Sequence, residues 1–252
     1  MKHFYYVADW GSQRYLHVDN IMSSAYASYD PKRGLMPTKM KYWDGIERLF
    51  IDSGGFSAFT RFAEYPYTVE EYITFIHQQI DRGLPVERVA IMDYPCEVSA
   101  NRERYRTNTD RIDATIRNAR RCIDGDRSMP WVPVIQGYTL DEYKDCWDKY
   151  QDIGITSDLW ALGSVCARKK TGGIRRIITA VKEYTDANLH TFGMTLNALR
   201  NPQVFFSVYS SDSRAWSFRN YHKKAEQLEE YRAKIGGLFK GFERQGKLGG
   251  YV

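Results

Sequence analysis

Short apolar runs alternate with longer helix-like segments along most of this chain, and this alternation is the strongest constraint on its fold. Seven runs are expected to form strands: residues 3–8, 49–52, 88–92, 131–136, 159–162, 190–193 and 204–209. Helical patterns are expected at residues 68–81, 102–121, 140–150, 172–184 and 217–239. Repeated strand–helix units of this kind form a parallel sheet that is covered by helices.

The number of expected strands favours a closed barrel. Seven candidates in 252 residues, with no change of composition to mark a boundary, predict one α/β domain over residues 1–252. The predicted architecture is a TIM (β/α)₈-type barrel with one strand irregular or missing. A doubly wound open sheet is the alternative. Residues 9–37 are expected to be a loop-rich insertion, and a basic helical segment is expected from about residue 217.

Charge and cysteine spacing limit the partners and the compartment. The formal net charge is +5, from 36 Lys and Arg against 31 Asp and Glu, which favours a polyanionic partner but also fits a basic soluble protein without one. Cys96, Cys122, Cys146 and Cys166 form no C-x-x-C pair, so neither a zinc site nor a disulfide framework is expected. We therefore expect reduced thiols in a cytoplasmic protein. No signal peptide or membrane-spanning run is recognised, so no membrane partner is expected.

A carboxylate followed by two glycines is the main site candidate. Asp52 comes directly after the apolar run 49–51, and Gly54 and Gly55 follow it. A glycine pair lets the backbone turn tightly and approach a ligand closely, although the same pair often makes an ordinary turn. Phe56 stands four residues after Asp52 and could cover a planar substrate. The pattern predicts that Asp52 faces an open surface at the end of a strand.

Polar or small residues follow the other predicted strands in the same way. The carboxyl ends of the strands of a barrel share one face, where the active sites of such folds are found. Each residue alone has a structural explanation, since aspartate often caps a helix and glycine often makes a turn. Together they predict one pocket that contains Asp52, Asp93, Gln136, Gly163, Gly193, Met194 and Asp212.

The order of these motifs resembles that of the tRNA-guanine transglycosylase superfamily. The segments concerned are Asp52-Ser53-Gly54-Gly55-Phe56, Asp93, Val134-Ile135-Gln136-Gly137, Ala161-Leu162-Gly163, Phe192-Gly193-Met194 and Ser211-Asp212-Ser213. The Ser-Asp-Ser-x-x-Trp form at residues 211–216 is more similar to the DNA-acting branch, the DpdA-type DNA-guanine transglycosylases. The resemblance covers roughly residues 52–216.

This resemblance implies a base exchange in a nucleic acid. Asp212 would attack the anomeric carbon of a guanosine nucleotide, and guanine would leave. A cyano- or amino-substituted 7-deazaguanine base would then take its place. Splitting the exchange into two displacements gives each half a lower barrier. Asp52 would act as general acid on the departing guanine and as general base on the incoming base, a role that calls for a raised pKa.

The resemblance also implies how the bases are recognised. Asp93 would accept hydrogen bonds from the ring N–H and the exocyclic amine. The Gln136 side chain and the Gly163 N–H would donate to the carbonyl oxygen. Phe56 and Met194 would sandwich the flat ring, with ordinary core packing as the alternative for both.

The expected polymer is DNA, whose target base must be flipped out or presented in a single strand. Arg168, Lys169 and Arg214 follow predicted strands near the pocket and are expected to hold phosphates. The tRNA enzymes carry a zinc site of three cysteines and a histidine beyond the nucleophile, whereas no cysteine follows Cys166 here. No metal and no cofactor are therefore expected.

Several alternatives remain open from the sequence. One is a tRNA substrate, and another is a barrel hydrolase that uses Asp52 and Asp212 as a carboxylate pair. A third is a non-catalytic nucleic-acid-binding relative. A homodimer is one option for the assembly.

Reversing the charge of Arg168 and Lys169 to glutamate should weaken binding to nucleic acid and flatten its dependence on salt, because fewer counterions are released. Titration of a labelled oligonucleotide at several salt concentrations measures both quantities. A slope equal to that of the parent protein would remove these two residues from the interface.

Overall fold

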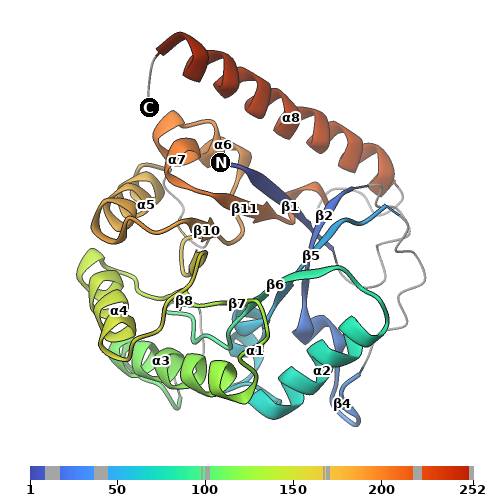
Figure 1. Cartoon of the computed structure of the whole chain (residues 1–252), viewed down its shortest axis with the longest axis vertical. Coiled ribbons are helices and arrows are strands. Elements are labelled where there is room, and N and C mark those ends of the chain that lie inside the picture. The colour runs from blue at the N-terminus through green and yellow to red at the C-terminus, as the bar shows by residue number, and fades with distance from the viewer. Residues whose placement is uncertain are drawn as a thin grey trace.

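The computed structural model describes residues 1–8, 18–36, 45–97, 99, 103–166, 168, 171–217 and 223–249, with side chains up to residue 244. Within these ranges the main sheet has nine strands in the order β7-β6-β5-β2-β1-β11-β10-β9-β8. Every pair of neighbours in it is parallel. Figure 1 shows the strands curving into a ring with helices outside it. The predicted α/β TIM-type barrel is confirmed.

Five of the expected strands lie where the sequence placed them, within two residues at each end. They are β1 (His3–Val7), β5 (Arg48–Asp52), β6 (Val86–Ala90), β9 (Trp160–Leu162) and β10 (Leu189–Thr191). Their central residues are nearly all buried, because barrel strands have side chains inside the ring and under the helices.

A proline divides the expected strand at residues 131–136. β7 (Trp131–Val132) pairs with β6, whereas β8 (Val134–Ile135) pairs with β9. Pro133 lies between them and has no N–H to donate to a ladder. The two short strands are therefore one interrupted barrel strand, and the seam of the ring falls at this proline.

The strand that the sequence analysis left unassigned lies in the region expected to be a loop. β2 (Asn20–Ser24) pairs with β1 on one side and with β5 on the other. The expectation of a loop-rich insertion over residues 9–37 was wrong here, because β2 has only two apolar residues, Ile21 and Met22, and no clear alternation. A short 3₁₀ helix, η2 (Ala25–Ser28), and the hairpin of β3 (Tyr29–Asp30) and β4 (Gly34–Leu35) follow it. Residues 9–17 and 37 lie outside the described residues.

The prediction of a seventh strand at residues 204–209 was also wrong. These residues fall mostly in α7 (Pro202–Ser207), where the Asn201 side chain caps the N–H groups of Gln203 and Val204. The buried apolar pair Val204 and Phe205 suits a helix as well as a strand, so the apolar run alone was ambiguous. The strand at this place is β11 (Ser210–Ser213), whose polar residues are all buried.

Capping residues define several of the covering helices. Capping boxes begin α2 (Val69–Asp81) at Thr68, α3 (Asn108–Gly125) at Thr107 and α4 (Leu140–Asp152) at Thr139. Thr68 and Glu71 form the first of these boxes, whereas α3 begins six residues later than expected because Thr107 caps it. The other helices are α1 (Gly55–Arg61), α5 (Thr171–Thr185) and α6 (Leu196–Leu199).

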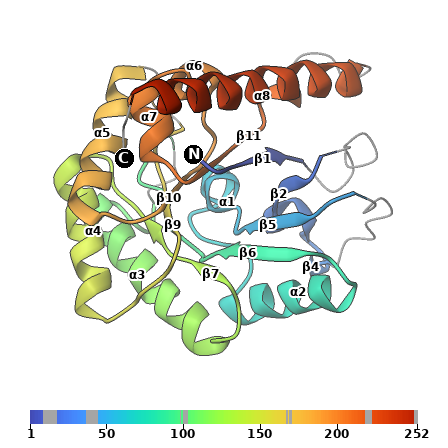
Figure 2. The ribbon, with the colours of Figure 1, turned by 45° about the horizontal axis from the view of Figure 1, so that its top comes forward.

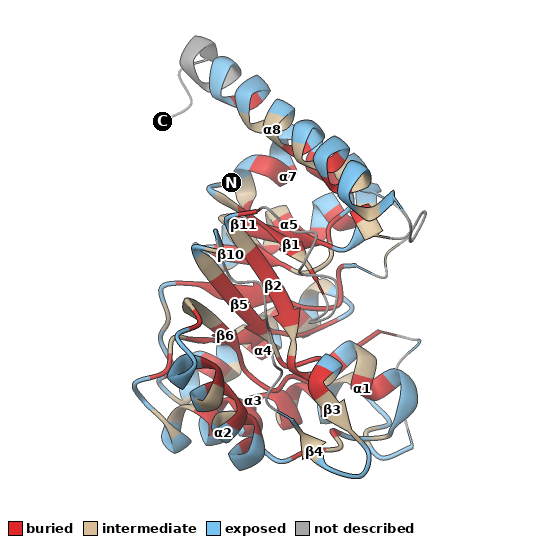
Figure 3. Cartoon of the chain, turned by 90° about the vertical axis from the view of Figure 1, so that its right-hand side faces the viewer, coloured by how far each residue is buried: buried red, intermediate tan, exposed pale blue. Residues whose placement is uncertain are grey.

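The long helix α8 (Lys224–Gly249) crosses one side of the barrel (Figures 1 and 2). It begins seven residues later than expected. Its side chains Leu228, Tyr231 and Ile235 are buried, and the Tyr231 ring lies 6.2 Å from that of Phe4 in β1. Figure 3 shows buried residues along the barrel strands and mainly exposed ones on the outer faces of the helices. Among the described residues, no helix is long and apolar enough to cross a membrane.

The turn after β5 is closely packed. Gly54 has a φ of 81°, which is the left-handed region that glycine adopts readily. A Cβ atom at this residue would lie 2.3 Å from the Tyr26 Cβ and 2.5 Å from the Ser24 Oγ. A Cβ on Gly55 would lie 2.6 Å from the Tyr65 hydroxyl oxygen. The glycine pair thus brings the chain close to Tyr26 of η2 and to Tyr65 in the segment between α1 and α2, and this fixes the direction in which α1 leaves Asp52.

Replacing Gly54 with alanine should lower the free energy of unfolding by about 2–4 kcal/mol, since both backbone strain and a collision are introduced. Gly83 is a matched control, because its φ is 79° but nothing lies within 4 Å of an added Cβ. Gly83→Ala should cost only about 1 kcal/mol. Urea denaturation of both variants measures the difference, and equal losses would contradict the role given to packing at Gly54.

Candidate active site

A cavity of about 610 Å³ opens at the carboxyl ends of the barrel strands. This volume lies in the usual range for small-molecule sites and accommodates a nucleobase with its sugar. Three carboxylates line it, and each comes from a different part of the barrel: Asp52 ends β5, Asp212 is in β11, and Asp93 follows β6. Predicted residues that also line it are Phe56, Gln136, Gly163, Gly193 and Arg214.

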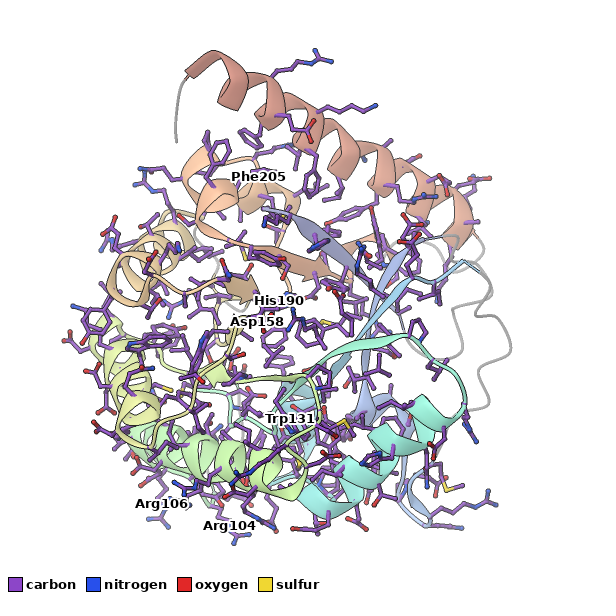
Figure 4. The ribbon with its side chains drawn as sticks, viewed as in Figure 1. Arg104, Arg106, Trp131, Asp158, His190 and Phe205 are labelled. Carbon is purple, nitrogen blue, oxygen red and sulfur yellow. The ribbon has the colours of Figure 1, made fainter. Side chains whose placement is uncertain are left out.

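Asp212 is buried and is held by two contacts to one carboxylate oxygen. The Gly193 N–H donates to Oδ1 at 3.0 Å, and the His190 Nε2 lies 3.2 Å from the same atom. The other ring nitrogen of His190 lies 2.9 Å from the Ser210 hydroxyl oxygen. Figure 4 shows His190 inside the ring of strands. The side chain of Asp212 therefore has a fixed orientation, with Oδ1 turned towards β10.

The sequence analysis did not identify His190 as a site residue. A single histidine in a short apolar run carries no signal of its own. Its neighbour two residues along, Phe192, lines the pocket, and side chains two apart on a strand share one face. The pairing of His190 with Ser210 across β10 and β11 depends on strand order, which the sequence does not reveal.

Asp52 has the raised pKa that acid–base chemistry requires. Removal of its carboxyl from bulk water raises its pKa to about 6, and the nearby charge of Asp212 adds to the rise. Hydrogen bonds from the Gly54 N–H and the Ser24 hydroxyl oppose it. Ser24 is the last residue of β2 and pairs in register with Asp52, so the strand that was missed supplies one of the donors.

Asp93 lies at the centre of a buried polar network. The Gln136 Nε2 donates to its Oδ2, and the Ser53 hydroxyl lies 3.2 Å from its Oδ1. The Tyr65 hydroxyl donates to its main-chain oxygen at 2.8 Å. Burial, followed by the charge of Asp52, raises the pKa of Asp93 to about 7. Near neutral pH the pocket therefore contains two carboxyls that exchange protons readily.

Gly163 packs against the amide of Gln136. A Cβ at Gly163 would lie 2.2 Å from the Gln136 Nε2, so a side chain at Gly163 would displace the amide. The Gly163 N–H donates to the Ile135 carbonyl oxygen at 3.0 Å as part of the barrel ladder. Because this N–H already donates within the sheet, it is not free to donate to a base oxygen as the sequence analysis expected. Gly163 contributes space rather than a donor.

One predicted ring contact is corrected by the structure. Met194 is only 1% exposed, belongs to the core, and does not line the pocket. Phe192, directly after β10, lines it instead. Phe56, near the start of α1, also lines the cavity and is 45% exposed. The Met194 N–H donates to the Asp212 main-chain oxygen at 2.9 Å, which ties the segment to β11.

The predicted phosphate-binding residues differ in their surroundings. Arg214 is exposed and lines the cavity mouth. The Arg168 guanidinium donates to the main-chain oxygens of Ser164 and Tyr138 and lies 4.6 Å from the Tyr138 ring centre. Lys169 lies outside the described residues. Arg168 therefore holds the loop after β9 in addition to carrying a charge near the pocket.

In the described part of the chain, no group of three or more His, Cys, Asp or Glu side chains is arranged to hold a metal ion. The four cysteines are free thiols.

A TIM-type barrel with three carboxylates in a cavity of about 610 Å³ at its carboxyl end defines an enzyme-like site for a small ligand. The family model of DpdA, described as DeoxyPurine in DNA protein A, matches residues 2–229. The chain belongs to this family, and the expected resemblance to the DpdA type is confirmed. No curated protein matches the chain.

Asp93→Asn should stabilise the fold at high pH. The folded pKa of Asp93, about 7, exceeds the ordinary value of 3.8, so the folded protein binds the proton more tightly than the unfolded chain does. Its ionisation therefore destabilises the fold above about pH 7, and this penalty disappears as the pH falls towards 4.

We expect the variant to exceed the parent in free energy of unfolding at pH 8 by at least about 1 kcal/mol, and by less at pH 5. Denaturant titrations at the two pH values measure this difference. A gap that does not change with pH would contradict the raised pKa.

Proposed function

We propose that this protein is a DNA-guanine transglycosylase, which replaces guanine in DNA with a 7-deazaguanine base through a covalent aspartyl intermediate. The observation that carries the proposal is the convergence of Asp52, Asp93 and Asp212 on one cavity. Membership of the DeoxyPurine in DNA protein A family supports this type of role and supports DNA as the polymer.

Asp212 is the proposed nucleophile. Its Oδ1 contacts the Gly193 N–H and His190, so the Oδ2 atom is the one proposed to attack the anomeric carbon. The attack forms a carbon–oxygen bond as the bond to guanine breaks, and the resulting sugar ester is opened later by the incoming base. Donors that hold one oxygen fix the direction of the other, which reduces the entropy lost in reaching the transition state.

Asp52 is the proposed proton carrier. Its protonated form donates to the departing guanine, and the carboxylate that remains removes the N9 proton of the incoming base. The proton count is then restored, and no other acid or base is needed. With a pKa of about 6, both the protonated and the ionised form of Asp52 are accessible near neutral pH, as general acid–base catalysis requires.

Base recognition is assigned to Asp93 and Gln136. An ionised Asp93 offers two acceptor oxygens that match the ring N–H and the exocyclic amine of guanine and of its 7-deaza analogue. The Gln136 Nε2, which is directed at Asp93, can turn its second N–H to the carbonyl oxygen of the base. Phe56 and Phe192 are proposed to cover the two faces of the ring, a contact worth about 1–3 kcal/mol per base.

The target nucleotide must leave a duplex to reach this cavity. Arg214 at the cavity mouth is proposed to hold a phosphate beside the flipped nucleotide. Arg168 is proposed to contact the strand further out, and the sequence-based expectation that Lys169 binds phosphate stays a prediction. The net charge of +5 is compatible with a polyanionic substrate.

Labelled guanine should enter duplex or single-stranded DNA in the presence of the parent protein. Asp212→Asn should lose this activity by at least about 10³-fold, because an amide is not a competent nucleophile. Incorporation of radiolabel into acid-precipitable DNA measures the exchange.

Asp152→Asn is the matched control, since Asp152 is exposed at the last residue of α4 and does not line the cavity. Unmodified tRNA serves as the competing polymer. Label in tRNA alone would replace DNA with tRNA as the substrate, and label in no polymer would contradict the proposed exchange.

A further inference from the structure

Three aromatic side chains form a row on the surface beside the cavity, and the proposed exchange does not use them. They are Phe62, directly after α1, Tyr26 in η2 and Tyr29 at the start of β3. The ring centres of Tyr29 and Phe62 lie 6.5 Å apart, and those of Tyr26 and Tyr29 lie 6.1 Å apart. Phe62 is 38% exposed, and both tyrosines are partly exposed. We call these three residues the aromatic row.

Arg61 lies between the aromatic row and the cavity. Phe56 and Ser57 at the start of α1 line the cavity. Arg61 is exposed and comes four residues after Ser57, and side chains four apart on a helix are neighbours, with about 5–6 Å between their Cβ atoms. The guanidinium carbon of Arg61 lies 5.8 Å from the centre of the Tyr26 ring. Arg61 is therefore one helical turn from the cavity mouth and beside the row.

The surface around the row carries positive charge that is open to a ligand. In the part of the chain that the structure describes, no ion pair includes Arg61, Lys32 or Arg33. Lys32 and Arg33 are exposed in the turn between β3 and β4, and Figure 3 shows this hairpin beside α1. The Asp30 carboxylate accepts from the N–H groups of that turn, and Glu64 pairs with an arginine before α3. A phosphate can therefore approach Arg61 without displacing a carboxylate.

Exposed rings beside basic side chains are the pattern that binds a single strand of nucleic acid. Bases stack on the aromatic faces, and phosphates contact the basic side chains. An apolar partner would leave the charge of Arg61 without a counter-charge, whereas an anion without bases would leave the rings exposed to water. A nucleotide satisfies both. The row adjoins a cavity proposed to hold a flipped nucleotide, so the next nucleotide of the same strand is the occupant within reach.

We propose that Arg61 and the aromatic row bind the nucleotide next to the flipped guanosine on the same DNA strand. This rests on the proposed base exchange. Arg61 contacts the phosphate, and the exposed face of Phe62 stacks on the base. Tyr29 supports Phe62 from the protein side, since its ring packs edge-on against Phe62 with an angle of 82° between the planes.

The arrangement of the strands separates this contact from that of Arg214. Arg214 lines the cavity directly after β11, whereas α1 leaves from the end of β5. Strands β2 and β1 lie between β5 and β11 in the sheet. Arg61 and Arg214 are thus on different sides of the cavity mouth, and they contact phosphates on opposite sides of the flipped nucleotide.

Arg61→Gln should weaken the binding of a single-stranded oligonucleotide that contains one guanine. It should also lower the slope of log affinity against log salt by about 0.7, the value for one phosphate of a single strand. Fluorescence anisotropy at several salt concentrations measures both quantities. Arg82→Gln is the matched control, since Arg82 is exposed directly after α2 and shortly before β6 begins, at the amino ends of the strands. An Arg61→Gln slope equal to that of the parent would overturn the phosphate contact.

Two oligonucleotides locate the contact along the strand. One carries its guanine at the 5′ end and the other at the 3′ end, so each extends from the cavity in one direction only. Arg61→Gln should weaken the binding of one of them by about threefold or more, and Arg214→Gln should weaken the binding of the other. Losses with the same oligonucleotide for both variants, or equal losses with both oligonucleotides for Arg61→Gln, would overturn the arrangement.

The stacking on Phe62 has a test of its own. Phe62→Leu keeps an apolar side chain against Tyr29 but has no aromatic face, whereas Phe62→Trp keeps one. The fluorescent base 2-aminopurine is placed beside the guanine, because stacking on an aromatic ring quenches its emission. The leucine variant should lose most of the quenching and bind about fivefold or more weakly, and the tryptophan variant should retain both. Equal quenching in the parent and both variants would overturn the stacking.

The outcomes separate this inference from the proposed function, because binding is measured without an incoming base. If labelled guanine enters no polymer but the effects of Arg61 and Phe62 are observed, the exchange fails and the binding surface stands. If guanine enters DNA and the variants bind as the parent does, the surface fails and the exchange stands. An oligoribonucleotide that binds with these effects, while DNA does not bind, would overturn DNA as the occupant.

Discussion

The main constraint on this structure is that several carboxyl groups are enclosed together at one end of the barrel. Burial raises the pKa of Asp52 and of Asp93, and in each case a neighbouring carboxylate adds to the rise. Such an arrangement is costly for folding, because a charged group loses its hydration. The cost is reduced by donors that the barrel supplies, such as the Gly54 N–H at Asp52 and the Gly193 N–H at Asp212. Stability and chemistry therefore make opposite demands on the same residues.

Glycines make this arrangement possible because the donors are backbone groups. Gly54 turns the chain so that its N–H reaches Asp52, and a Cβ there would meet Tyr26. Gly193 has a φ of 65° and donates to Asp212, and a Cβ there would lie 2.8 Å from the Cys166 Cβ. At both positions a side chain would push apart the loops that enclose the cavity. The glycines that follow the strands are thus required by packing as well as by the turn.

The sequence predicted the parts of the site that strand ends determine. Asp52, Asp93 and Gln136 were identified because each follows or ends a strand, and a parallel barrel brings such positions together. Asp212 was identified after a strand expected at residues 204–209, which fall mostly in α7, and it lies within β11. Phe192 and Met194 could not be told apart in this way, since residues two apart on a strand share one face. The chain turns at Gly193, which has a φ of 65°, so Phe192 lines the cavity while Met194 is buried in the core. Contacts between distant segments were also beyond reach, including those of His190 with Ser210 and of Glu97 with Ser164.

The fold, like the site, was predicted correctly only in part. Regular segments with caps or long apolar runs were placed correctly, as α2 and β5 show. β2 and β11 were missed because their residues are largely polar, and a polar strand forms only where a tertiary partner accepts its side chains. In β11 that partner is the neighbouring strand, where the Thr191 hydroxyl donates to that of Ser211 at 3.1 Å. The least predictable strands are thus those that line the candidate site.

Arg168 connects the proposed binding of DNA with the shape of the base pocket. Its guanidinium holds the main-chain oxygen of Ser164, the residue that connects Gln136 to Glu97. A phosphate that drew Arg168 away would release this contact, so the binding of DNA and the shape of the base pocket share one side chain. The two roles have different signatures. A lost phosphate contact changes the salt dependence of binding, whereas a displaced Ser164 changes the choice of base at a constant salt dependence.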